Sequence, residues 1–152
     1  MKKTFLSICL LATVTIGVFS SCKKDKDDPN QEIEITTANM IGSYKLTAET
    51  DKLGTLPERN TLAEDYDACE LDDLYQFEAA NVVKYVDAGT KCEEDHSGTV
   101  TWKLEGKKLT IDDRNFDVVK LTKSQIIFTF TRETVFEGKT YTGVQTSTFT
   151  RQ

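Results

Sequence analysis

From Ile41 to the end of the chain, apolar and polar residues alternate with a period of two, and turn residues interrupt the alternation at short intervals. This period places successive side chains on opposite faces of a strand, so each segment has one apolar face to bury. Aromatic and β-branched residues, which are typical of strands, are frequent in these segments. The pattern therefore predicts an all-β domain.

The pattern predicts eight strands, most of them joined by tight turns. They are expected over Ile41–Glu49, Leu71–Glu78, Val82–Asp87, Thr99–Leu104, Lys108–Asp112, Phe116–Leu121, Gln125–Phe136 and Lys139–Thr150. Sequential antiparallel strands with one apolar face can close into an up-and-down barrel, which buries that face and removes exposed edges. We therefore expect an eight-stranded antiparallel barrel, with an open sandwich of two small sheets as the alternative.

The long connection from Thr50 to Ala68 is the exception to these tight turns. Its sequence Thr61-Leu62-Ala63-Glu64 matches a capping box and predicts one short helix. We interpret the connection as a surface loop, with a lid over one barrel end as the alternative.

The N-terminus has the features of a secretory leader. Lys2 and Lys3 precede an apolar run from residue 5 to residue 19, which is followed by Ser20-Ser21-Cys22. This arrangement resembles the lipobox of bacterial lipoproteins, which implies cleavage after residue 21 and acylation of Cys22. The alternatives are an ordinary signal peptide without lipid and an uncleaved anchor helix, for which the run is short.

Without residues 1–21, the remaining chain suits a single domain. We expect a lipidated flexible linker over residues 22–37, because Lys23–Asn30 has no apolar side chain to bury. A barrel domain over residues 38–152 is expected to follow. The acidic cluster after Cys22 resembles signals that send some lipoproteins to the outer leaflet of the bacterial outer membrane. We expect a cell-surface location, with the periplasmic face as the alternative.

The charge of the chain disfavours some partners. The formal net charge is −6, and loss of the two leader lysines makes the rest of the chain more negative. A negative surface disfavours nucleic acid and anionic lipid headgroups. The lipid on Cys22 is the sole membrane attachment that we expect, because no other segment is long and apolar enough to insert.

Two cysteines, Cys69 and Cys92, lie in the predicted domain. An even pair in an exported chain predicts a disulfide. With a hairpin turn centred between Ala80 and Asn81, facing residues have numbers that sum to 161, as those of the two cysteines do. A zinc site that uses the neighbouring His96 and Glu93 or Glu94 is the alternative, but the cysteine spacing matches no common zinc pattern.

A family resemblance covers about residues 38–151. Gly42-Ser43-Tyr44 is similar to the Gly-x-Trp sequence at the start of lipocalins, with Tyr44 in the place of the tryptophan. Further residues resemble the lipocalin-like domain that is common among small bacterial lipoproteins. They are Cys69, Asp72, Asp73, Phe77, Cys92, Gly98–Trp102 and Leu109. The resemblance implies an eight-stranded barrel with room for a ligand, but it names no ligand.

Residues that carry enzyme or metal chemistry form no strong pattern. His96 is the only histidine and lies in a predicted acidic loop. The sequence has no nucleophile elbow and no phosphate-binding glycine loop, so we predict neither an enzyme nor a cofactor. Five acidic residues are candidate calcium ligands but lack the glycine-containing loop of an EF-hand, so we interpret them as a solvated rim. They are Asp65, Asp67, Glu70, Asp72 and Asp73.

Large side chains occupy the positions that alternation directs into the barrel, and they are compatible with two functions. Alternation points Trp102, Leu104, Leu109, Ile111, Ile126, Phe128 and Phe130 inward, with Tyr44 closing one end. Side chains of this size can nearly fill an eight-stranded barrel, so we expect a small pocket near one mouth. Our candidate ligand-binding residues are Tyr44, Trp102, Phe128, Phe130, Arg132 and Gln145, the last two as polar lining.

We therefore expect a lipid-anchored cell-envelope protein that binds a small apolar or amphipathic molecule. The alternative is a filled barrel without a small-molecule ligand, which acts through its surface on another envelope protein.

Overall fold

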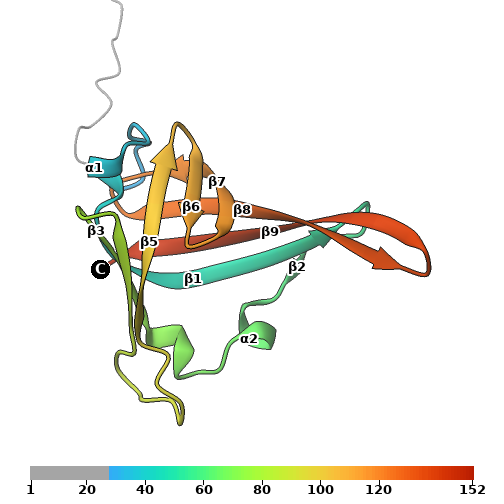
Figure 1. The fold of residues 1–152 in the computed structure, drawn as a ribbon, viewed down its shortest axis with the longest axis horizontal. Coiled ribbons are helices and arrows are strands. Elements are labelled where there is room, and N and C mark those ends of the chain that lie inside the picture. Colours follow the sequence, from blue (N-terminus) through green and yellow to red (C-terminus); the bar gives the residue numbers. More distant parts are fainter. Residues whose placement is uncertain (1–27) are drawn as a thin grey trace, which may run out of the picture.

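The computed structural model describes residues 28–152, so the leader, its cleavage site and Cys22 lie outside the described residues. Eight antiparallel strands follow one another around a barrel, and the first pairs with the last to close it (Figure 1). They are β1 (Gly42–Leu53), β3 (Leu74–Glu78), β4 (Val82–Val86), β5 (Gly98–Glu105), β6 (Lys108–Ile111), β7 (Arg114–Leu121), β8 (Gln125–Phe136) and β9 (Lys139–Arg151). This confirms the predicted eight-stranded up-and-down barrel and excludes the open sandwich.

The connection after β1 differs most from its prediction. Strand β1 continues to Leu53, and the two-residue strand β2 (Arg59–Asn60) folds back to pair with it. The predicted helix is present as α2 (Leu62–Asp65), with Thr61 at its N-cap. The capping box itself is wrong, because the Thr61 side chain makes no capping hydrogen bond. Its hydroxyl is buried without a partner among the described residues.

The register of the β3–β4 hairpin also corrects a prediction. Glu78 pairs with Val82 across the loop of residues 79–81, so facing residues have numbers that sum to 160 and not 161. Asn81 takes a left-handed conformation with φ 59°, a conformation that asparagine tolerates better than most residues. A three-residue loop centres the turn on a residue and not between two residues, which shifts the register by one.

Helix α1 (Thr37–Met40) covers one end of the barrel and closes it. Beneath it Tyr44 is fully buried and donates a hydrogen bond of 3.0 Å to the carbonyl oxygen of Met40. The Arg151 guanidinium lies 4.8 Å from the centre of the Tyr44 ring and donates hydrogen bonds to the carbonyls of Asn39 and Ile41. Tyr44 therefore closes one end, as predicted.

Gly42 makes room for this arrangement. Its φ is +153°, and a Cβ at this position would lie 2.5 Å from the Arg151 guanidinium. A glycine two residues before the buried Tyr44 thus lets the arginine reach over the ring. The Gly-x-aromatic sequence at the start of β1 has a packing reason in this fold.

The predicted flexible linker over residues 22–37 is docked on the barrel in its described part. The backbone N–H of Ile33 donates a hydrogen bond of 2.9 Å to the carbonyl of Leu121, and Glu32 bridges to Thr122. Ile33 and Ile35 pack against the core. The expectation of a flexible coil up to Thr37 is therefore wrong for this segment, because its alternating isoleucines have apolar surface to bury.

Strands β8 and β9 extend beyond the barrel as a long hairpin, seen at the right of Figure 1. Strand β7 pairs with β8 only as far as Thr129, whereas β8 and β9 stay paired to their turn. Val135 and Phe136 near the tip are exposed. The fully buried core lies toward the α1 end, where Met40, Tyr44, Val83, Leu109 and Ile126 each expose none of their surface.

Candidate ligand-binding cavity

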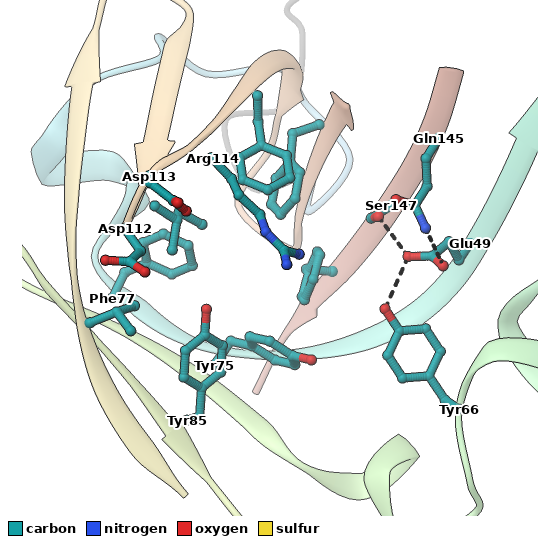
Figure 2. Close-up of a pocket in the computed structure, with 15 residues that line it drawn as sticks. Glu49, Tyr66, Tyr75, Phe77, Tyr85, Asp112, Asp113, Arg114, Gln145 and Ser147 are labelled. Carbon is teal, nitrogen blue, oxygen red and sulfur yellow. Dashed lines mark hydrogen bonds between the residues drawn. The ribbon is translucent and has the colours of Figure 1, made fainter. Parts of the chain in front are cut away.

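A cavity of about 620 Å³ occupies the part of the barrel that the core does not fill (Figure 2). Seven aromatic and two aliphatic side chains line it: Tyr66, Tyr75, Phe77, Tyr85, Phe116, Phe128, Phe149, Val100 and Ile111. Its polar lining consists of Glu49, Asp112, Asp113, Arg114, Gln145 and Ser147. The volume falls in the range of roughly 300 to 1,000 Å³ that is usual for ligand sites. The pocket is therefore larger than the small one that the sequence predicted.

The aromatic walls are held by ring contacts between strands. Tyr75 makes edge-to-face contacts with Tyr85 at 5.2 Å and with Phe149 at 4.9 Å between ring centres. Phe128 stacks on Phe149 at 4.9 Å and meets Phe116 at 5.1 Å. Such contacts favour fixed ring positions. The cavity is thus bounded by packed rings that belong to the folded barrel itself.

One wall holds a buried carboxylate, Glu49, which is only 2% exposed. Its Oε1 accepts a hydrogen bond of 2.7 Å from Gln145, and its Oε2 accepts bonds from Ser147 at 2.9 Å and Tyr66 at 3.3 Å. Figure 2 shows the three donors around it. A buried charge needs such partners. Burial and the adjacent negative charge of Glu49 both raise the pKa of Tyr66, which keeps its hydroxyl protonated as a donor.

The mouth of the cavity lies at the β6–β7 turn. Asp112 and Asp113 form this turn, and both are exposed, as is Arg114 at the start of β7. The side chain of Arg114 reaches into the open space of the cavity, facing Tyr75 and Tyr85 (Figure 2). Burial raises the pKa of Tyr85, and the positive charge of Arg114 partly offsets this rise. Burial also raises the pKa of Tyr75, to about 12.

The connection between β1 and Cys69 contributes Tyr66 to the cavity wall. Through its hydrogen bond to Glu49, this connection is fastened to the inside of β1. It therefore does part of what the alternative prediction assigned to a lid, although most of its residues are exposed as in a surface loop.

Of the six predicted ligand-binding residues, Phe128 and Gln145 line the cavity. Tyr44 and Trp102 lie in the filled part of the core, and Trp102 donates a hydrogen bond of 3.2 Å to the Glu78 carbonyl. Phe130 packs on Phe116 outside the lining. Most of the predicted aromatic residues therefore pack the barrel and do not line a site.

Arg132 does not provide the polar lining that we predicted. Its guanidinium pairs with Asp51 at 3.0 Å, on the part of β8 that extends beyond the end of β7. Alternation alone gave Arg132 the same face as Phe128, but it could not show that the barrel wall ends before this position. The cation at the cavity is Arg114.

The disulfide between Cys69 and Cys92 is present, with 5.4 Å between the Cα atoms. It joins the loop after β4 to the start of η1 (Glu70–Asp72), so it lies beyond the hairpin strands and not within them. The shifted register therefore does not prevent it, because neither cysteine belongs to the ladder.

Acidic residues that we predicted to form a solvated rim accept backbone hydrogen bonds near the disulfide. Asp72 accepts a hydrogen bond from the backbone N–H of Thr90, and Asp73 accepts one from Ala88. Glu70 accepts one from the backbone of Asp67. His96 is exposed in the loop between β4 and β5. Within residues 28–152, no group of three or more His, Cys, Asp or Glu side chains is placed to hold a metal ion.

Sequence reasoning missed most of the polar cavity residues. Glu49 was assigned only as the end of a strand, although a glutamate at an inward position of the alternation was a usable signal. Arg114 begins β7, Tyr66 lies in the connection after β1, and Tyr85 lies in β4, so their meeting depends on closure of the barrel.

Residues 40–150 match the family model of the lipocalin-like domain. Neither the curated proteins nor the solved structures contain a significant match to the chain.

Proposed function

Because the chain belongs to the family of lipocalin-like domains, we propose that it is a binding protein that holds a small apolar or amphipathic molecule inside its barrel. Members of this family are typically non-catalytic. The observation that carries the proposal is the cavity of about 620 Å³ with seven aromatic side chains in its wall. Removing apolar surface from water stabilises a complex by about 25 cal/mol per Å².

The alternative, a filled barrel that acts only through its surface, is less favoured by this cavity. The large side chains fill the α1 end, where Trp102 is 2% exposed. Toward the mouth, however, Tyr75, Tyr85 and Phe116 remain partly accessible although they pack against the core. Apolar surface of this kind gains from a ligand that covers it.

The second part of the proposal is attachment to a membrane through lipid on Cys22, at the bacterial outer membrane. It is supported by the resemblance of Ser20-Ser21-Cys22 and the preceding apolar run to a lipobox. Among residues 28–152, no helix is long and apolar enough to cross a membrane. Pro29 lies beside Ser124, next to the end of the barrel that Arg151 and Tyr44 close. A chain tethered there presents its cavity mouth away from the attachment point.

Ligand binding is tested by filling the cavity. Val100 lines it from β5, so Val100→Phe is expected to reduce its volume, whereas Thr101→Phe on the same strand points outward. The full chain carrying Cys22→Ala, which has no lipid of its own, is titrated with laurate and with dodecanol by calorimetry. Val100→Phe is expected to weaken binding at least tenfold and Thr101→Phe to leave it unchanged. If the Cys22→Ala chain without a further substitution binds neither compound, the alternative function, a barrel that acts through its surface, is favoured.

Lipid attachment is tested separately. The full chain is expected to incorporate labelled palmitate and to sediment with membranes. Cys22→Ala is expected to lose the label and to appear in the soluble fraction or as an unprocessed precursor. A processed Cys22→Ala protein that still sediments with membranes would contradict the lipid anchor.

A further inference from the structure

The guanidinium of Arg114 is a charged group of the cavity wall that has no partner within the described residues. It is the one cationic side chain among the described residues that line the cavity. Within residues 28–152 its side chain makes no hydrogen bond or ion pair, although other exposed cations such as Lys108 do. Arginine offers a planar fork of donors that matches a carboxylate. This fork faces the cavity and has no partner within the described chain.

Two tyrosines, Tyr75 and Tyr85, line the same cavity. Tyr75 and Tyr85 form ring contacts, but their hydroxyls make no hydrogen bond to another described residue. Both hydroxyls are protonated and able to donate at neutral pH, because the ordinary pKa of tyrosine is about 10 and burial raises the pKa of both. The positive charge of Arg114 acts on Tyr85, and Figure 2 shows these two side chains in the same part of the cavity. The charges that act on Tyr75 include that of Glu49 and not that of Arg114.

Glu49 at the opposite wall does not play the equivalent role for a cation. Its two oxygens already accept three hydrogen bonds, from Gln145, Ser147 and Tyr66. Most of its acceptor capacity is thus used within the protein. Among the charged hydrogen-bond donors of this cavity, the arginine has its capacity free.

Resting on the proposed function, we propose that the cavity binds amphipathic carboxylates, with the carboxylate on Arg114 and Tyr85 and the apolar tail among the rings of Phe116, Phe128 and Phe149. The exposed position of Arg114 keeps the head group next to solvent. This lowers the desolvation cost of its charge.

The acidic residues at the mouth set the charge that is accepted. Asp112 and Asp113 directly precede Arg114 in the turn and line the same cavity. Their negative charge repels every negative charge on the ligand, so it opposes a doubly charged head group more than a singly charged one. A head group with a single negative charge is therefore favoured.

The test compares three ligands that share a tail of the same length. Laurate, dodecanol and dodecyltrimethylammonium are titrated, below the concentrations at which they form micelles, into the full chain carrying Cys22→Ala. Laurate is expected to bind about tenfold more tightly than dodecanol, the lower end expected for hydrogen bonds to a charged group. The advantage should shrink as salt is added, because the arginine is exposed.

Arg114→Gln is expected to remove this advantage of laurate and to leave dodecanol binding unchanged. Arg132→Gln is the matched control, since that arginine is paired with Asp51 away from the cavity. The inference is overturned if dodecanol or dodecyltrimethylammonium binds as tightly as laurate, or if Arg114→Gln leaves laurate affinity unchanged. In each of these cases, if Val100→Phe still weakens the binding of laurate or dodecanol, the proposed function is supported although the inference about carboxylates is not.

Discussion

Glu49 on β1 and Ser147 on β9 stand directly opposite each other in the pair of strands that closes the barrel, and the serine hydroxyl donates a hydrogen bond of 2.9 Å to the glutamate. The same carboxylate accepts from Gln145 on β9 and from Tyr66 in the connection after β1. One buried anion thus joins the closure of the barrel to the wall of the cavity.

Replacing Glu49 with glutamine should lower the free energy of unfolding by about 1 to 3 kcal/mol, because the new amide group faces donors and leaves one of them unsatisfied. Urea unfolding at pH 7 measures the change. Glu133→Gln, at an exposed position of β8, is the control and should stay within about 0.5 kcal/mol of the original. Equal effects of the two substitutions would contradict a structural role for the Glu49 hydrogen bonds.

Gly42→Ala should destabilise the protein by about 1 to 3 kcal/mol, because the added methyl group meets the Arg151 guanidinium and the backbone has a positive φ. Gly98→Ala is the matched control, since a Cβ there meets nothing within 4 Å. Thermal unfolding followed by circular dichroism compares the two. If Gly98→Ala costs as much as Gly42→Ala, the close approach of Arg151 is not what requires the glycine.

Removing the disulfide with Cys69→Ser and Cys92→Ser together should lower the free energy of unfolding by about 3 kcal/mol. The bond closes a loop with a sequence separation of 23, for which loop-closure entropy gives this magnitude. Urea unfolding in the presence and absence of a reductant provides the measurement. The double variant should not respond to the reductant, and an unchanged midpoint for the original chain on reduction would contradict the prediction.

Stability should fall as the pH rises above 10. Burial raises the pKa of Tyr44 and Tyr75 to about 12. Tyrosines of the unfolded chain lose their protons near pH 10, before these two do in the folded protein. The contribution of the raised pKa is therefore fully present below pH 10 and is lost as the pH rises toward 12.

Urea midpoints measured between pH 8 and pH 11.5 test this dependence. Tyr75→Phe should make the alkaline decline shallower, because one of the raised groups is gone. A decline of identical slope in the two proteins would show that Tyr75 does not titrate late in the folded state.

Much of the fold followed from the alternation of residues. All eight barrel strands were predicted, because a period of two reports directly which face of a strand is buried. Their bounds were less well predicted. Leu71 reads as part of a strand by its pattern, but hydrogen bonds within η1 turn residues 70–72 into a short helix before β3 begins. The β1 strand runs on to Leu53 because β9 continues to offer it a partner.

The cavity was predictable only in part. Phe128 and Gln145 were found from their inward phase, and Arg132 shared that phase but lies where the barrel wall has already ended. The position of a residue in the alternating pattern indicates which face of the sheet its side chain occupies. It does not indicate how far along the barrel axis the side chain lies. Tyr66 belongs to an irregular connection, so no alternating pattern could predict where its side chain points.

By itself, the sequence determined the all-β class, the order of the strands, the pairing of Cys69 with Cys92 and the aromatic character of the interior. These depend on local periodicity and on the count of residues of each type. Only the tertiary structure decided that the interior is filled at the α1 end and hollow at the other, and that Arg114 rather than Arg132 faces the cavity. Those properties depend on where each strand ends relative to its neighbours, which is set when β1 pairs with β9 and the barrel closes.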